Sequence, residues 1–253
     1  PMANVISVCN LKGGAGKSTI AVNLACQIAK STAGKCVLVD ADRQGTARAW
    51  GQSGILPITV LPMVLDEAKA EDRYPGMIWI SQIKQIAESC RYVIIDLPAG
   101  LQYSLAAVAL VSDLVVVPVN PSGVDFHSTR QFMDLIGNAR EFRGTGKPAC
   151  MIVPNRIDSR TSISRDLGVY EQFGERITPP IHTRKILADA FDAGSWVGKI
   201  DPESASAHEF ETLAAAVLDA AALLADVPAV TSRANTGHGT AYPHPAAAGT
   251  IPH

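Results

Sequence analysis

The sequence lacks the features that mark secreted, metal-bound or membrane-spanning proteins. Its five cysteines form no C-x-x-C pair and its six histidines show no zinc spacing, so we expect buried free thiols, with an iron–sulfur or zinc role as the alternative. The most apolar stretch, 101–119, is interrupted by Asp113 and Pro118, whereas a membrane span needs about 20 continuous apolar residues. A net charge of −2 argues against a protein that coats DNA passively.

What the sequence does contain is an alternation of short runs rich in Val and Ile with longer helical patterns. The runs are nearly continuously apolar, as in parallel strands covered on both faces. We expect strands at 5–9, 36–39, 92–95, 114–119 and 149–153, and helices at 17–30, 78–89, 103–111, 126–142 and 205–225. This alternation predicts an α/β fold with a doubly wound, mostly parallel sheet and helices on both faces.

The composition divides the chain into two parts. We expect a single domain over 2–227, followed by a low-complexity, disordered tail over 228–253 that is rich in Ala, Thr, Gly, His and Pro. No basic leader precedes the first apolar run, so we expect a cytoplasmic protein.

The clearest motif is a glycine-rich loop between the first expected strand and the first expected helix, Asn-Leu-Lys-Gly-Gly-Ala-Gly-Lys-Ser-Thr over 10–19. Amides in such a loop, and the helix N-terminus after it, surround phosphate oxygens. The residues expected to bind the nucleotide here are Gly13, Gly14, Ala15, Gly16, Lys17, Ser18 and Thr19. Among them, Lys17 reaches the β- and γ-phosphates and the Ser18 hydroxyl binds Mg²⁺, which predicts a P-loop NTPase.

This loop departs from the usual pattern G-x-x-x-x-G-K-S/T, because Leu11 stands where the first glycine would fall. It also carries a second lysine, Lys12, at its outer lip. We predict that Lys12 points away from its own phosphates and reaches the nucleotide of a facing subunit, so that ATP joins two copies. The alternative is a solvated surface lysine.

Aspartates end two of the expected strands. Asp40 and Asp42 follow the run at 36–39, and Asp96 follows the run at 92–95. Carboxylates at the C-terminal ends of parallel strands lie where ligands bind. We expect Asp96 to hold Mg²⁺, mostly through water, and Asp40 to support the Mg²⁺ shell, with an Asp-rich turn as the alternative for 40–42.

Polar residues also follow the strand expected at 149–153. The amide of Asn155 suits the edge of adenine, and the guanidinium of Arg156 can stack on a base. Ordinary loop residues are the alternative at both positions.

The segment 12–19 resembles the deviant Walker A motif of the ParA/MinD family of ATPases, and the resemblance runs in order from position 5 to about 226. The stretch 111–126 is most similar to small ParA-type (ParF-like) plasmid partition proteins. The resemblance implies that Lys12 crosses an ATP-sandwich dimer. It also implies that Asp42 orients the attacking water, in a segment like D-x-D-P-Q-G where Arg43 replaces the proline. Lys12, Lys17 and Asp42 are then the catalytic set.

The resemblance further implies a slow ATPase that uses ATP and Mg²⁺ and dimerises with ATP. Its expected partners are non-specific DNA and a ParB-like centromere-binding protein or cargo adaptor, with no membrane, and its expected place is on the nucleoid. Segregation of plasmid or chromosomal DNA is the expected function. The alternatives are a positioner of other cargo, such as a carboxysome or a chemoreceptor cluster, and a metabolic ATP-dependent enzyme with the same loop.

DNA contact is expected in a locally basic region. Nine basic and five acidic residues lie between Arg140 and Lys185, and contacts to phosphates add up across a dimer. Arg160, Arg184 and Lys185 are the candidate contacts, the last two because their segment resembles the DNA-contacting region of the family. A solvated basic face is the alternative.

Overall fold

The computed structural model describes residues 4–33, 35–65, 75–100, 105–161 and 166–225. The tail expected over 228–253 lies outside the described residues. Within the described part, no helix is both long enough and apolar enough to cross a membrane.

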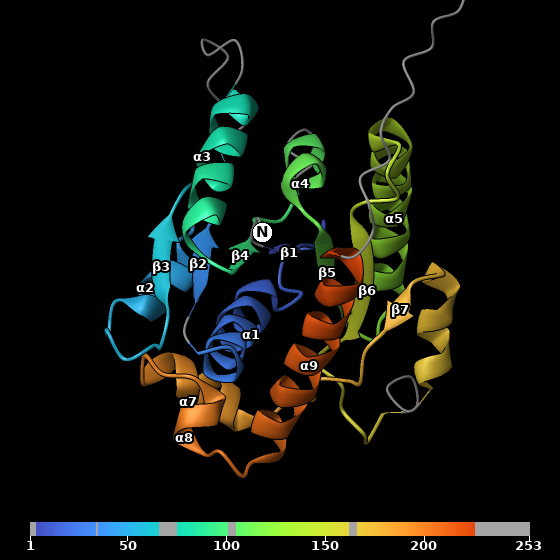
Figure 1. Ribbon diagram of the computed structural model, residues 1–253. Helices are drawn as coiled ribbons and strands as arrows, with labels where there is room; N and C mark the ends of the chain where they lie inside the picture. Colours follow the sequence, from blue (N-terminus) through green and yellow to red (C-terminus); the bar gives the residue numbers. More distant parts are fainter. Residues whose placement is uncertain (1–3, 34, 66–74, 101–104, 162–165, 226–253) are drawn as a thin grey trace, which may run out of the picture.

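One sheet of seven parallel strands organises the molecule, in the order β3-β2-β4-β1-β5-β6-β7 (Figure 1). The strands are β1 (Asn4–Val8), β2 (Cys36–Asp40), β3 (Thr59–Pro62), β4 (Tyr92–Asp96), β5 (Leu114–Val119), β6 (Ala149–Pro154) and β7 (Arg176–Ile177). In the register of the sheet, Asp96 pairs with both Val8 and Asp40. Three strands therefore end level with one another, beneath the loops that carry the predicted site.

Helices cover both faces of the sheet, as expected for a doubly wound α/β domain (Figure 1). On one face lie α1 (Lys17–Ser31), α2 (Thr46–Gly51), α7 (Lys185–Asp192), α8 (Val197–Ile200) and α9 (Ala205–Ala225). On the other lie α3 (Pro75–Ser89), α4 (Leu105–Val111), α5 (Gly123–Arg143) and the 3₁₀ helix η1 (Leu167–Phe173).

Each face of the sheet has its own apolar core, because side chains alternate along a strand. In β1, Ile6 and Val8 pack into the core under α1 and α9, while Val5 packs into the core under α3, α4 and α5. Strands buried on both sides must be apolar at nearly every position. This explains the continuous Val and Ile runs of the sequence.

Several element boundaries differ from those expected. The helix expected at 78–89 begins earlier, at Pro75, a residue that suits the first helical position because its fixed φ is already helical. The helix expected at 126–142 begins at Gly123, because Ser122 caps it by accepting a hydrogen bond from the Asp125 amide. The helix expected at 103–111 is described only from Leu105.

Candidate functional site

The glycine-rich loop lies between β1 and α1, at the C-terminal edge of the sheet. Gly14 and Gly16 adopt left-handed φ values of 76° and 84°, which glycine reaches without strain. Gly16 is the N-cap of α1 and provides no side-chain cap. The first-turn amides of α1 therefore remain available to an anion, as the predicted phosphate role requires.

The two lysines of the loop take different directions. Lys17 is buried, and its Nζ donates to the backbone carbonyl of Lys12 at 3.1 Å. Burial lowers the pKa of Lys17, which nearby Cys9, Asp96 and Asp42 oppose. Lys12 instead reaches α5, where its Nζ lies 2.9 Å from the carboxylate of Asp125, and its side chain is one third exposed.

Asp125 is a site residue that the sequence did not reveal. It lies in the first turn of α5, its side chain is 4% exposed, and it accepts hydrogen bonds from Lys12, Asn120 and Ser122. The pattern Ser122-x-x-Asp125 predicts a capped helix start, but the contact with Lys12 joins residues 113 positions apart. Lys12 is therefore held within its own chain by a nearly buried carboxylate.

Asn10 is a second residue that the sequence did not single out. Its side chain is fully buried and joins the loop to the centre of the sheet. Its Nδ2 donates to the Pro118 carbonyl at 2.7 Å and to Thr129 at 3.2 Å, while its Oδ1 accepts from the Lys12 amide at 3.2 Å. The backbone at Lys12 is thus tied to β5 and α5.

The two aspartates after β2 have different surroundings. Asp40 is 1% exposed, and its oxygens accept from the amides of Asp42 at 3.1 Å and Arg48 at 2.7 Å. Burial raises the pKa of Asp40, and these backbone hydrogen bonds oppose the rise. Asp42 is partly buried and accepts from the Gln44 amide at 2.9 Å. Asp40 thus shapes the loop that presents Asp42, with both of its oxygens already used by backbone donors.

Asp96 is fully buried, and neither carboxylate oxygen accepts a well-aligned hydrogen bond from a described residue, although the Ser18 hydroxyl lies close enough to interact with it. Burial raises its pKa to about 7, with smaller rises from Asp40 and Asp42, while Ser18 and Lys17 oppose the rise. Two unsatisfied anionic oxygens beside a hydroxyl are costly unless a cation joins them. Ser18 and Asp96 therefore fit Mg²⁺, which takes one or two protein ligands and fills its shell with phosphate oxygens and water.

A cleft of about 670 Å³ opens beside the loop, within the roughly 300–1,000 Å³ of typical ligand pockets. Gly16, Thr19, Asn155 and Arg156 line it, together with Thr46, Trp50 and the segment 183–191. The Asn155 Nδ2 donates to the Ala15 carbonyl at 2.7 Å, so half of its amide fixes the loop. Arg156 has a left-handed φ of 53°, which is uncommon for a residue with a side chain.

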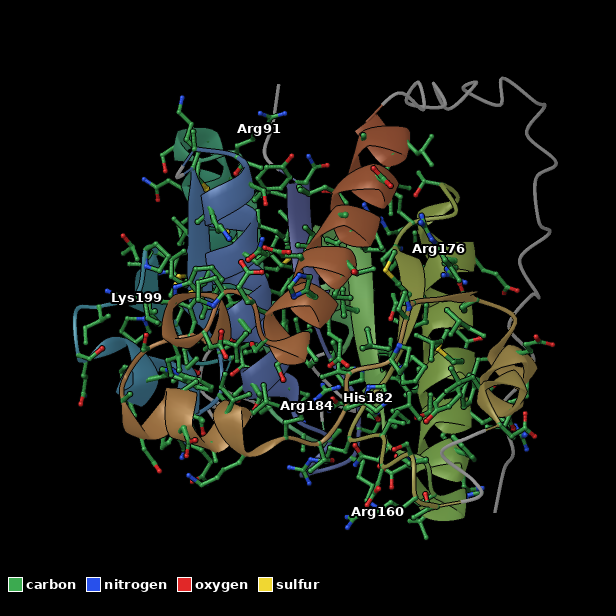
Figure 2. The ribbon with its side chains drawn as sticks, turned by 90° about the horizontal axis from the view of Figure 1, so that it is seen from below. Arg91, Arg160, Arg176, His182, Arg184 and Lys199 are labelled. Atoms are coloured by element: carbon green, nitrogen blue, oxygen red, sulfur yellow. The ribbon has the colours of Figure 1, made fainter. Side chains whose placement is uncertain are left out.

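The three predicted DNA contacts are all paired within the chain. Arg160 binds Asp158 and Lys185 binds Asp189, and both cations are 88% exposed. Arg184 lines the cleft and binds Glu209 at 2.7 Å, next to the bond between His182 and the same carboxylate. Figure 2 shows Arg184 and His182 side by side, with Arg160, Arg176 and Lys199 spread around them. The structure therefore places Arg184 in the cleft wall and the other two at the surface.

Comparisons with known proteins agree on one family. The model of the CobQ/CobB/MinD/ParA nucleotide binding domain matches residues 6–197. The chain is 26% identical over 210 residues to a maintenance of carboxysome distribution protein A from Halothiobacillus neapolitanus, covering 82% of this chain and 92% of that protein. It is 25% identical over 239 residues to the chromosome-partitioning ATPase Soj from Thermus thermophilus, covering 84% and 94%.

Solved structures share the fold. The ATP complex of an McdA variant from Cyanothece superposes with a TM-score of 0.70 at 18% identity, covering 87% of this chain and 96% of that one.

Proposed function

Because the family model matches most of its length, the chain belongs to the CobQ/CobB/MinD/ParA nucleotide-binding family, and we propose that it is an ATPase that positions a large cargo. ATP and Mg²⁺ bind at the loop over 10–19. Two ATP-bound copies then join face to face, and hydrolysis, slow until a partner stimulates it, separates them.

One observation carries this proposal: the loop holds two lysines with different orientations. Lys17 lies inside the loop, where a phosphate-binding lysine belongs. Lys12 instead reaches Asp125 on α5, and its side chain remains one third exposed there. A cation at the lip of a phosphate site is placed to neutralise the phosphates of a second copy. A nucleotide site that served one chain alone would not need it.

The residues around the loop then have distinct roles. The amides of 13–18 and the start of α1 hold the phosphates, and Lys17 neutralises the terminal ones. Ser18 and Asp96 hold Mg²⁺, which when bound neutralises charge on the β- and γ-phosphates. Asp42 orients the attacking water from the half-exposed loop that Asp40 shapes. Asn155 and Arg156 border the space for the base.

The names of the relatives indicate what kind of cargo to propose. One named relative maintains carboxysome distribution and another partitions chromosomes. These names support a DNA cargo and a protein-body cargo to a similar extent, so the proposal is ATP-driven positioning on the nucleoid rather than plasmid segregation in particular. The dimer binds DNA non-specifically, with Arg160 and Lys185 as exposed contacts, and an adaptor protein links it to the cargo.

The test is the oligomeric state of the purified chain, measured by light scattering with ATP and Mg²⁺, with ADP, and without nucleotide. We expect a dimer with ATP only. Lys12→Ala should bind a fluorescent ATP analogue as the parent chain does, yet remain monomeric. The matched control is Lys199→Ala, which removes an exposed lysine from α8 and should leave dimerisation unchanged.

Two results would count against the proposal. Normal dimerisation of Lys12→Ala would remove the cross-subunit role of that lysine. Turnover that depends on a small substrate and ignores DNA would favour the metabolic enzyme instead. In the proposed function, ATP-dependent affinity for random-sequence DNA falls steeply as salt rises, because the contacts are to phosphates.

A further inference from the structure

An apolar groove of about 230 Å³ lies between α4 and α5, on the sheet face opposite α1 and α9. Its lining includes Ala106, Ala109, Leu110, Ala139, Phe142 and Arg143. The side chain of Phe142 is 84% exposed and that of Leu110 is 38% exposed. Phe142 and Leu110 thus expose apolar surface next to a hollow that is itself lined mainly by apolar side chains, and a contiguous apolar surface of this kind is a candidate interaction site.

This groove is separate from the nucleotide site. Phe142 lies in the last turn of α5, about 26 Å along the helix from Asp125 at a rise of 1.5 Å per residue. The groove and the contact between Asp125 and Lys12 therefore lie at opposite ends of α5. Its volume is also below the roughly 300–1,000 Å³ of small-molecule pockets. It suits a few protruding apolar side chains.

The groove has one charged wall, Arg143. Its Nη1 donates to the carbonyls of Ala109 at 2.5 Å and Ser112 at 2.7 Å, which fixes the guanidinium at the end of α4. The nearby carboxylate of Asp113 is bound by Lys147 at 2.8 Å. Among the described residues, no ion pair joins Arg143 to a carboxylate, although Asp113 offsets part of its charge, and the remaining donors of its planar fork suit an incoming carboxylate.

We propose that this groove binds an amphipathic helix of a partner protein, which places apolar side chains against Leu110 and Phe142 and a carboxylate on Arg143. Two helices that flank an apolar furrow receive a third helix through residues spaced i, i+3, i+4 and i+7. The single fixed cation selects an acidic helix over a basic one.

The groove also has a physical link to the nucleotide site. α5 carries Phe142 at one end and Asp125, the holder of Lys12, at the other. A helix seated between α4 and α5 thus acts on a rigid element that contacts the loop. That such a partner alters ATP hydrolysis rests on the proposed function, whereas the binding itself does not.

The experiment selects binders from a displayed library of helical peptides against the full chain. We expect enriched peptides to share an apolar stripe with Asp or Glu beside it. The best peptide is then synthesised, and its affinity is measured by fluorescence anisotropy. Phe142→Ser should weaken binding at least about tenfold, as for a buried aromatic anchor. Changing the peptide's carboxylates to amides should also weaken it about tenfold, because a charged hydrogen bond is lost.

The control is Met77→Ser on α3, which removes another exposed apolar side chain, 59% accessible, outside the groove. It should leave the affinity unchanged. The proposal is overturned if no enriched peptide depends on Phe142, or if the enriched sequences are basic. It is also overturned if Phe142→Ser abolishes self-association of the chain, which would assign the groove to a second copy, or if the selected helix matches the segment 226–253. Peptide binding without ATPase activity would refute the proposed function alone.

Discussion

The buried carboxylate of Asp96 gives the sharpest quantitative prediction. Folding removes it from water, the Ser18 hydroxyl and Lys17 offset only part of this cost, and its pKa rises from 3.8 to about 7. The folded state therefore favours the protonated form. Proton binding by Asp96 therefore contributes to the free energy of unfolding in full below about pH 4, and this contribution is lost as the pH rises through 7. Asp96→Asn cannot ionise and should escape this loss.

The stability that Asp96→Asn should gain follows from the difference between the pKa of Asp96 in the folded protein and its ordinary value. At 1.36 kcal/mol per pH unit, the ionised carboxylate destabilises the nucleotide-free protein by up to about 4 kcal/mol at pH 8. The neutral acid and the amide leave similar polar atoms buried, so this part of the energy largely cancels. Asp96→Asn should thus be more stable than the parent chain by a few kcal/mol at pH 8, and by little at pH 4.

Urea denaturation at pH 4, 6 and 8, without nucleotide and with a chelator, measures this difference. Asp134→Asn, an exposed aspartate on α5, is the control and should change stability little at any pH. If Asp96→Asn is destabilising at pH 8, or if its gain does not shrink as the pH falls, the reasoning from burial is wrong. The same variant should lose Mg²⁺-dependent ATP hydrolysis, because the amide is a poor Mg²⁺ ligand.

Three further variants test single contacts of the site. Asp42→Ala should bind ATP but accumulate as a dimer, because no group orients the water; hydrolysis at the parent rate in a single-turnover assay would remove Asp42 from that role. Asp125→Asn weakens the contact that holds Lys12 within its own chain. It should lower the ATP concentration needed for dimerisation, measured by light scattering, about tenfold, which corresponds to the loss of one charge-assisted hydrogen bond. Weaker dimerisation would instead place Asp125 in the dimer contact. Gly16→Ala would put a Cβ 2.4 Å from the Asn155 Nδ2, whereas Gly14→Ala, also at positive φ, meets nothing within 4 Å. Calorimetry should therefore show a larger loss of ATP affinity for Gly16→Ala, and equal losses would show that Asn155 does not matter.

The fold was largely predictable because its main elements are long or strongly patterned. The five expected strands occur within one residue of the structure's bounds, and the helix at 205–225 matches α9. β3 and β7 were missed for a physical reason. They are the edge strands of the sheet and are short, and neither has a fully buried residue, so neither shows the burial on both faces that identifies the central strands.

The site was predictable only where one segment carries the chemistry. The loop over 10–19 and the aspartates at strand ends are local patterns. In contrast, Asp125 contacts Lys12 from 113 positions away, and the segment 183–191 reaches the cleft through the packing of α7. Arg184 is a different case. Its segment resembles the DNA-contacting region of the family, and the fold places its side chain in the cleft wall, where Glu209 binds it. A DNA contact of Arg184 stays a prediction.

Under the proposed function, the arrangement of the two lysines couples nucleotide binding to the release of Lys12 from Asp125. Lys17 donates to the backbone carbonyl of Lys12, and Lys12 is anchored through its side chain to Asp125 and through its amide to Asn10. A phosphate that draws the Lys17 ammonium toward itself takes away one of these three restraints on residue 12. In the proposed dimer, the nucleotide of the second copy then offers phosphate charge to Lys12 in exchange for the Asp125 carboxylate. Because both exchanges require a triphosphate, the contacts of Lys12 with Asp125 and Lys17 should persist until ATP binds.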